Sequence, residues 1–429
     1  NGFINTVPGS HGGDDLFLFT FLLGVVFKLL GTSLLAARMV SIIGGLVGLA
    51  GFLWILKELK INSRFVILFS GLIFIFSNVN YIIFRSVRPE SWVIAFGIWA
   101  LYFIIKSVKT NKELNYLFCG LLSSAVFLCH PHGALYILLF GIIVLLYCLD
   151  KKRIRALTYY IIGIVPMAII LLFYLFIVRQ ETLFEFFGNW SNRVAIEQSS
   201  FMSSQMSNLG TFFRTYTLGL KRIIILFFEL GVLLYGLFFY KKNKYVFMIS
   251  ITGLLYFVIA MIILSPFSTR HFGEVLFFSL ITYALLLDYY QTHQKIYKFV
   301  IAIGLLYFAN NLAGDIYFIW ENRNNTSYSV IENKIDQIIP DKTKVLTLLN
   351  FWFPLKNNDN YNSHTRWQKT KYNDLSHFLD SNDLDYVVIS DYFLKGVTPT
   401  SGRQIKETKY LEDKKKYYNS VHSFALSNG

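Results

Sequence analysis

Ten separate apolar segments occupy most of this chain, and they constrain its fold more than any other feature. A helix that spans a membrane needs about 20 mostly apolar residues, or somewhat fewer when flanking residues reach the interface. The ten segments are residues 33–56, 65–84, 91–105, 114–129, 133–149, 156–178, 222–240, 245–264, 274–290 and 297–320. The sequence therefore predicts an α-helical polytopic membrane protein with about ten spans.

The composition excludes the other broad classes of protein. Of the 429 residues, 54% are hydrophobic and only 15% are charged. A soluble chain of this size leaves about a quarter of its unfolded-state surface exposed, so it could not hide this much apolar surface. Low charge argues against disorder, and 3 cysteines are too few for a disulfide scaffold. All the cysteines lie inside apolar segments, so we expect small buried hydrophobes and no redox or zinc site.

The net charge of +14 could suggest nucleic acid, but its distribution argues otherwise. Residues 1–320 hold 25 Lys and Arg against 13 Asp and Glu, whereas residues 321–429 hold 15 against 13. Alternate short loops hold 15 of these positive charges, at residues 57–64, 106–112, 151–155, 241–244 and 295–298. Short loops that carry Lys and Arg stay on the cytoplasmic side, so these five loops are expected to face the cytoplasm and the alternate loops to face outward. The excess charge then belongs to a multi-pass protein of the inner (plasma) membrane, and no nucleic-acid partner is expected.

The segments around the spans define a transmembrane domain over residues 1–320. Residues 16–30 are apolar but too short to span a membrane, so they predict a helix that lies at the outer interface. Residues 179–221 are predicted to form one long external loop. The chain begins with Asn1 in an expected outer loop, so we expect a first span upstream and regard the chain as N-terminally truncated.

The polar tail, residues 321–429, alternates helical and strand patterns. Residues 328–339 and 372–380 have the period of helices, and residues 344–349 and 386–390 have that of strands. The tail has no glycine-rich phosphate loop, so no nucleotide site is expected there. With the span order above, the tail is predicted to be a small C-terminal extracytoplasmic α/β domain.

Polar clusters fall at the span ends that this topology assigns to the outer face. They comprise Arg85, Arg88 and Glu90 after the second span, His130 and His132 after the fourth, Arg270 and His271 before the ninth, and Asp14 and Asp15 before the interfacial helix. Four clusters on one face predict one shared cavity. Arginine forks suit phosphate oxygens, and carboxylates and imidazoles can take a proton or hold a divalent ion. A lipid that bears a phosphate would suit both kinds of group.

Each cluster also has a simpler interpretation. Arg85 and Arg88 could merely reach lipid headgroups, and the histidines on either side of Pro131 could merely end a helix. Asp14 and Asp15 could cap the interfacial helix. Glu229 lies within a span, where an ionisable group is costly and is usually functional or paired. No cofactor and no metal ligand set is predicted, and a divalent metal stays an open alternative.

Three motifs give the chain a resemblance to a known family. They are KLLGTSLLAARMVSIIGGL at the start of the first complete span, FRSVRPESW over Phe84–Trp92, and STRHF over Ser268–Phe272. In this order and on one outer face, they resemble the polyprenyl-phosphate-dependent GT-C glycosyltransferases, which include protein O-mannosyltransferases and aminoarabinose transferases. The resemblance covers most of residues 10–290.

The resemblance implies an integral membrane glycosyltransferase. It would move a sugar from a polyprenyl-phosphate donor to an acceptor glycan, lipid or protein, with inversion at the anomeric carbon. Arg88 and Arg270 would contact the lipid phosphate, Arg85 would assist, and Glu90 would orient an arginine. An acidic residue of the first outer loop would act as the base. Either Asp14 or Asp15 has this role, or the residue that has it lies upstream of Asn1. A transporter or flippase of polyprenyl-linked sugars and a non-catalytic membrane anchor subunit are the alternatives.

Overall fold

The structure, a computed structural model, describes residues 17–179, 210, 220–263, 272–321, 323, 328–347, 353–362 and 385–388. It separates the chain into two compact units. One consists of residues 16–30 and 35–317 and is a helical bundle, and the other includes the tail from residue 318 onward. Each unit is described by itself below.

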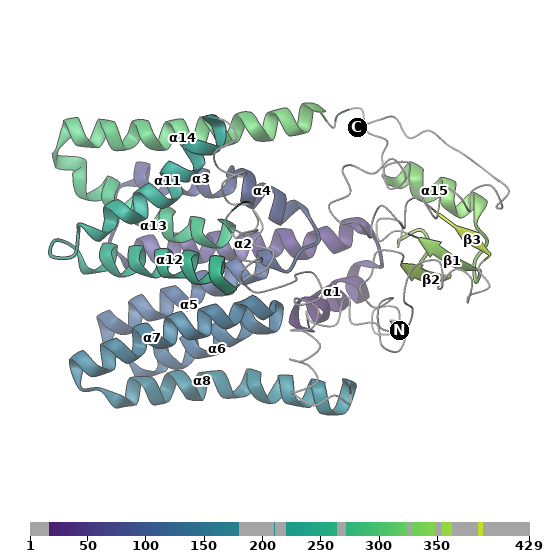
Figure 1. The fold of residues 1–429 in the computed structure, drawn as a ribbon, viewed down its shortest axis with the longest axis horizontal. Helices are drawn as coiled ribbons and strands as arrows, with labels where there is room; N and C mark the ends of the chain where they lie inside the picture. The colour runs from purple at the N-terminus through teal and green to yellow at the C-terminus, as the bar shows by residue number, and fades with distance from the viewer. Residues whose placement is uncertain are drawn as a thin grey trace. The chain divides into compact units, whose positions relative to one another are not determined.

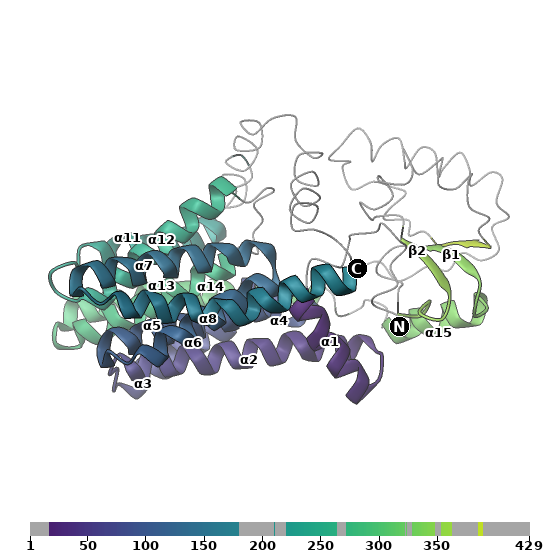
Figure 2. The ribbon, with the colours of Figure 1, turned by 90° about the horizontal axis from the view of Figure 1, so that it is seen from below.

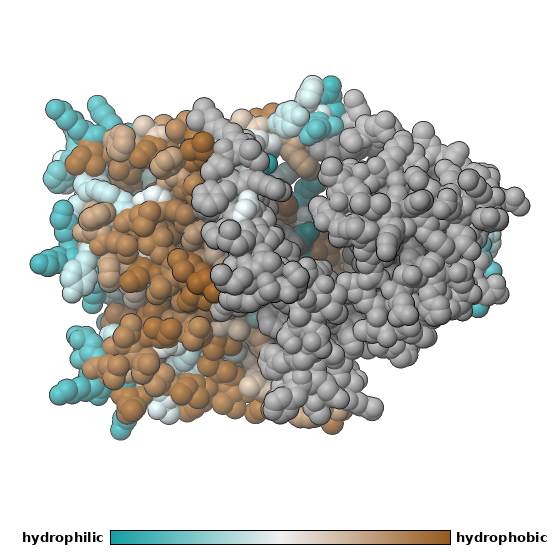
Figure 3. All heavy atoms as spheres, in the orientation of Figure 1, coloured by the Kyte–Doolittle hydropathy of each residue, from teal (hydrophilic) through white to brown (hydrophobic). Residues whose placement is uncertain are grey.

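The bundle is built from helices that run alongside one another in both ribbon views (Figures 1 and 2). Its helices are α1 (Phe17–Leu30), α2 (Leu34–Glu58), α3 (Arg64–Ile75), α4 (Asn78–Arg85), α5 (Glu90–Thr110), α6 (Glu113–Cys129), α7 (Ala134–Lys151), α8 (Ile154–Phe173), α11 (Leu220–Leu237), α12 (Lys244–Ile263), α13 (Phe272–Tyr289) and α14 (Gln294–Glu321). A single 3₁₀ turn, Pro131–Gly133, joins α6 to α7. Brown, hydrophobic atoms cover much of the visible side of the bundle, as expected of a surface that faces lipid (Figure 3).

The ten apolar segments fall on helices of the bundle, but the predicted number of ten spans is not confirmed. Among the described residues, 7 helices are long and apolar enough to cross a membrane, namely α2, α5, α7, α8, α12, α13 and α14. The segment 65–84 is not one straight helix, because α3 and α4 meet at a bend of 58°, and together they raise the number to 8. The helix α6 belongs with the shorter apolar helices, as does α1, whose interfacial position stays a prediction.

The helices α6 and α8 pack very closely because each has a glycine at the contact. A Cβ atom at Gly120 would collide with the carbonyl oxygen of Tyr160, and one at Gly163 would collide with that of Leu117. Small residues at such positions let two membrane helices approach until their backbones touch. The helix α13 lies at the centre of the bundle and is the most buried of the candidate spans.

Contacts between loops show that the basic ends of the helices gather at one end of the bundle. The Nζ atom of Lys109, near the end of α5, lies 3.5 Å from a carboxylate oxygen of Glu58 at the end of α2. The same Nζ atom lies 5.7 Å from the ring centre of Tyr245 at the start of α12. Tyr147, near the end of α7, donates a hydrogen bond to Asn111 after α5. The prediction that this end faces the cytoplasm is untested by these contacts.

The second unit contains a short parallel sheet and one helix within its described residues. The helix is α15 (Tyr328–Ile338), and the strands are β1 (Lys344–Thr347), β2 (Asp359–Asn362) and β3 (Tyr386–Val387), in the order β2-β1-β3. Apolar side chains of Ile335, Val345 and Leu355 are buried together. The predicted helix at 328–339 and the predicted strands at 344–349 and 386–390 are found at those places, β2 was not predicted, and residues 372–380 lie outside the described residues. The α/β domain over the whole of 321–429 stays a prediction.

Candidate functional site

The turn between α4 and α5 is held by hydrogen bonds to its main chain. The backbone N–H of Arg88 donates to Oγ of Ser41 on α2 over 3.0 Å, and Oγ of Ser91 donates to the carbonyl of Arg88 over 2.9 Å. The indole N–H of Trp92 donates to the carbonyl of Val40 over 3.0 Å. The backbone of the turn is therefore fixed against α2, whatever its side chains bind.

The guanidinium of Arg88 is paired at this turn with a buried carboxylate. A terminal nitrogen of Arg88 lies 3.5 Å from Oε1 of Glu90, which occupies the first position of α5. The side chain of Arg88 is 37% exposed and that of Glu90 is 3% exposed. Glu90 therefore contacts the guanidinium from its buried side, and part of the guanidinium remains exposed. The planar guanidinium of an arginine held this way can still donate to an oxyanion such as phosphate.

A second ion pair joins the turn before α7 to the start of α13. Nε2 of His132 lies 2.7 Å from Oε1 of Glu274, and both side chains are almost completely buried. The hydroxyl of Tyr256, on α12, donates a hydrogen bond to Oε2 of Glu274. The ring of His130 packs on that of His132, with 4.0 Å between their centres. Gly133 allows the tight turn, because a Cβ there would strike the backbone of α6.

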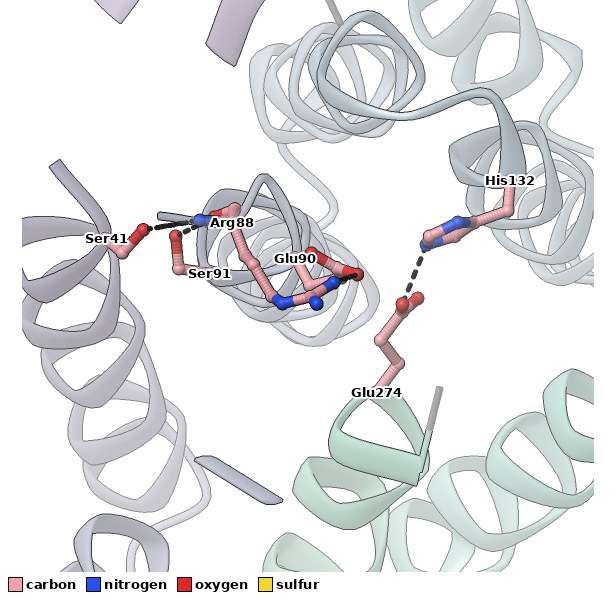
Figure 4. A network of polar contacts seen from close by, with 6 residues as sticks. All are labelled: Ser41, Arg88, Glu90, Ser91, His132 and Glu274. Carbon is pink, nitrogen blue, oxygen red and sulfur yellow. Dashed lines mark hydrogen bonds and ion pairs between the residues drawn. The ribbon is translucent and has the colours of Figure 1, made fainter. Parts of the chain in front are cut away.

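The two ion pairs lie near each other at one end of the bundle. A Cβ atom added at Gly273 would come within 2.8 Å of Ile83 on α4 and 3.3 Å of Ile94 on α5, so the start of α13 packs directly against these helices. Figure 4 shows Glu274 reaching from α13 toward His132, with the Arg88 and Glu90 pair beside them. The structure thus brings together side chains from four helices or turns that are far apart in the sequence.

The predicted site residues fall into three groups. Arg88, Glu90 and His132 come together, with His130 stacked on His132. Arg85 ends α4, is exposed, and places its guanidinium 5.6 Å from the ring centre of Tyr81. Asp14, Asp15, Arg270 and His271 lie outside the described residues.

Sequence reasoning missed the partners that bury the site. Glu274 is not among the predicted site residues, yet it contacts both His132 and Tyr256. Its signal in the sequence is an acidic residue in the first turn of an otherwise apolar helix. Ser41 and Tyr256 carry no comparable signal, because a hydroxyl in an apolar helix is common.

The described part of the chain contains no group of three or more His, Cys, Asp or Glu side chains arranged to hold a metal ion. The residues that line the site supply two ion pairs instead. The described residues therefore supply no ligand set for a divalent metal ion. A divalent metal stays an open alternative for the rest of the chain.

Comparison with known proteins identifies the fold. No protein-family model and no curated protein matches the sequence. Among solved structures, apo ArnT from Cupriavidus metallidurans is similar over 92% of this chain and 82% of its own, with 11% identity and a TM-score of 0.53. The structure of the same protein bound to undecaprenyl phosphate is similar over 83% of this chain and 77% of its own, also with 11% identity and a TM-score of 0.53. ArnT is an aminoarabinose transferase of the GT-C class, so the GT-C fold expected from the sequence motifs is confirmed.

Proposed function

We propose that this multi-pass protein is a membrane glycosyltransferase that uses a polyprenyl-phosphate-linked sugar. The observation that carries the proposal is the gathering of Arg88, Glu90, His132 and Glu274 at the end of the bundle away from the basic loops. The shared fold with ArnT, which has been crystallised with undecaprenyl phosphate, supports this lipid as the class of donor.

Arg88 is the residue that we assign to the donor phosphate. Its guanidinium is partly exposed, its backbone is fixed by Ser41, and Glu90 holds its fork from the buried side. At a lipid boundary, where water is partly excluded, a fixed positive charge stabilises a departing phosphate more than it would in bulk water. Arg270, four residues before Glu274 in the sequence, is the second proposed phosphate contact, and Arg85 assists.

The pair of His132 and Glu274 has a different proposed role. Both side chains are too buried to meet a substrate in this arrangement. Their bond instead fixes the start of α13 to the turn before α7, and the segment with Arg270 and His271 immediately precedes α13. His130 is less buried than His132, so it is the histidine that we assign to substrate contact.

The proposed reaction is an inverting displacement at the anomeric carbon. An acceptor oxygen or nitrogen attacks that carbon, the bond from the carbon to the phosphate oxygen breaks, and the polyprenyl phosphate leaves with the electron pair. A base takes the proton from the acceptor. Asp14 and Asp15 are the candidates for this base within the chain. The proposed location is the plasma membrane, with the reaction and the C-terminal domain on the extracytoplasmic side.

A flippase of polyprenyl-linked sugars is the second candidate. It is favoured by the bend between α3 and α4 and by the buried carboxylate of Glu229 inside the bundle, since transporters use broken helices and polar groups near mid-membrane. The enzyme is preferred because the partly exposed charged group, the guanidinium of Arg88, lies at the end of the bundle.

The test is a transfer assay with the full-length protein in vesicles that contain a radiolabelled polyprenyl-phosphate sugar pool. We expect Arg88→Ala to lower kcat/KM for the donor by about 10- to 100-fold, the loss of one charge-assisted contact. Arg88→Lys should recover only part, because it keeps the charge but not the fork. Arg64→Ala, at the start of α3, is the matched control and should match the wild type.

One result would contradict the enzyme, and another would contradict the role of Arg88. Wild-type protein that moves the lipid-linked sugar across the membrane, without joining the sugar to any acceptor, would favour the flippase. Equal transfer by the wild type and by Arg88→Ala, with both folded, would remove the phosphate role of this turn.

A further inference from the structure

The bend between α3 and α4 is closed by side-chain amides instead of by backbone hydrogen bonds. In a continuous helix the N–H of Asn78 would donate to the carbonyl of Phe74, four residues earlier. Here the N–H of Asn78 donates over 3.0 Å to Oδ1 of Asn311, which comes from α14. The carbonyl of Phe74 accepts over 2.8 Å from Nδ2 of Asn80. Two amide side chains therefore replace one missing helical bond.

The residues at the bend explain why side chains of other residues satisfy its backbone. Ser77 occupies the cap position of α4, and its side chain makes no cap hydrogen bond. Asn311 instead accepts from Asn78, whose N–H is one of the four at a helix start that have no partner within the helix. Asn80 and Asn311 are 1% and 2% exposed. In lipid, a broken backbone persists only where other groups satisfy its polar atoms, because there is no water to do so.

Asn311 is itself fixed from two sides. Its Nδ2 atom donates over 2.9 Å to the carbonyl of Tyr307, one turn earlier on α14. The hydroxyl of Tyr307 donates over 3.0 Å to Oε1 of Glu229 on α11. Tyr307 and Asn311 are spaced by four residues, so they share one face of α14. A row of polar groups thus connects α11 and α14 to the bend.

The bend controls where the arginine turn lies. The helix α4 has 8 residues and ends at Arg85, and Arg88 follows in the turn. At 1.5 Å per residue the helix is a lever of about 12 Å, so a rotation of about 10° at the bend would move its far end by about 2 Å. A displacement of about 1 Å can lower a rate about 100-fold when it moves a group that positions substrate.

We infer that Asn311 is a positioning residue, which holds the bend between α3 and α4 and thereby sets the place of the Arg85–Arg88 turn. The inference rests on the proposed function for its catalytic consequence, but its structural part can be tested without activity. When Asn311 loses its acceptor, we expect the freed N–H of Asn78 to bond to the carbonyl of Phe74, its partner in a continuous helix, beside or in place of Asn80. This change would straighten the helix.

The experiment measures the bend directly. Spin labels are placed at Phe65→Cys on α3 and Ile82→Cys on α4, two exposed positions, in full-length protein whose native cysteines are replaced. Full straightening of the 58° bend would lengthen the distance between the labelled backbone positions by about 3 Å, from a rise of 1.5 Å per residue. We expect Asn311→Leu, which keeps the shape but not the acceptor, to lengthen this distance.

The same variants are assayed for transfer. Asn311→Leu should raise KM for the donor lipid by about tenfold, the effect of one lost hydrogen bond, with a smaller change in kcat. Asn311→Asp retains an acceptor oxygen and should recover both the distance and much of the KM. Asn115→Leu, which removes another buried amide that bonds to Thr110, is the matched control and should change neither.

The outcomes separate this inference from the proposed function. An unchanged distance in Asn311→Leu overturns the positioning role, whatever the transfer assay gives. A longer distance in a protein whose wild type transfers no sugar supports the positioning role and refutes the proposed function. If Asn311→Leu does not accumulate, Asn311→Ala also lacks the acceptor and is measured in its place, with the same expected result.

Discussion

The buried pair of His132 and Glu274 allows a quantitative test of how the site is held together. The two side chains are 1% and 0% exposed, and their charged atoms are 2.7 Å apart. Removal of one partner from a buried ion pair costs about 3–5 kcal/mol, because the remaining charge has lost both water and its counterion. Glu274→Ala also leaves the hydroxyl of Tyr256 without this acceptor, which adds about 1–3 kcal/mol.

A double-mutant cycle isolates the pair from these other losses. We expect Glu274→Ala and His132→Ala each to lower the free energy of unfolding by about 3 kcal/mol or more. The double variant should lose clearly less than the sum, since no unpaired charge is left, with a coupling energy of about 1–3 kcal/mol. The measurement is equilibrium unfolding of the full-length protein in mixed detergent micelles. Glu274→Gln should cost less than Glu274→Ala, because an amide can still accept from Tyr256.

The control cycle combines Glu274→Ala with Lys109→Ala, whose partner Glu58 lies at the basic end of the bundle. Effects of distant sites add within about 0.5 kcal/mol. If the cycle of Glu274 and His132 is equally additive, the two residues are not a coupled pair, and the proposed anchoring of α13 to the turn before α7 is wrong.

Two further predictions concern the bundle. Gly163→Ala should destabilise the protein in a detergent melting experiment, because its Cβ would collide with the main chain of α6, whereas Gly231→Ala, with nothing within 4 Å of its Cβ, should have little effect; equal melting temperatures would contradict the close packing of α6 and α8. In right-side-out vesicles, an impermeant maleimide should label Arg85→Cys but not Lys112→Cys, since the two positions are predicted to lie on opposite faces of the membrane. Labelling of both at the same rate would refute that topology.

The helices could be predicted from the sequence because lipid imposes a local rule. Backbone groups inside a membrane have no water to bond to and are satisfied most simply within their own helix, so a long apolar run predicts a helix. The segments 245–264 and 274–290 accordingly match α12 (Lys244–Ile263) and α13 (Phe272–Tyr289) within two residues. The strand β2 (Asp359–Asn362) escaped prediction because its residues, DNYN, carry no apolar alternation.

The bend in the segment 65–84 could not be predicted by the same rule. Its composition is that of one span, and the residues that break it are ordinary Ser and Asn side chains. In the structure the N–H of Asn78 at this break donates to Asn311, which lies 233 residues later in the sequence. The residues near the bend do not indicate that Asn311 is the partner of Asn78. A span that is interrupted by contacts from elsewhere in the bundle can therefore be recognised only after folding.

The candidate site shows the same division between local and distant information. Alternation of the spans was enough to predict that the segments with Arg88 and His132 reach the same end of the bundle. It could not predict their buried partners, because Ser41 is 47 residues from Arg88 and Glu274 is 142 residues from His132. In each case a residue within a helix holds a turn, since Ser41 bonds the backbone of Arg88 and Glu274 bonds the side chain of His132.

This division has a physical consequence for how the site can change. Its charged turns are held by Ser41 and Glu274, which belong to long helices, and by the bend at Asn78. Each of these anchors is buried, and a buried polar group that loses its partner cannot turn to water. A rearrangement of the arginine turn must therefore exchange hydrogen-bond partners instead of simply breaking them. The exchange that the proposed role of Asn311 implies is of this kind, because the N–H of Asn78 would leave Asn311 and bond to the carbonyl of Phe74.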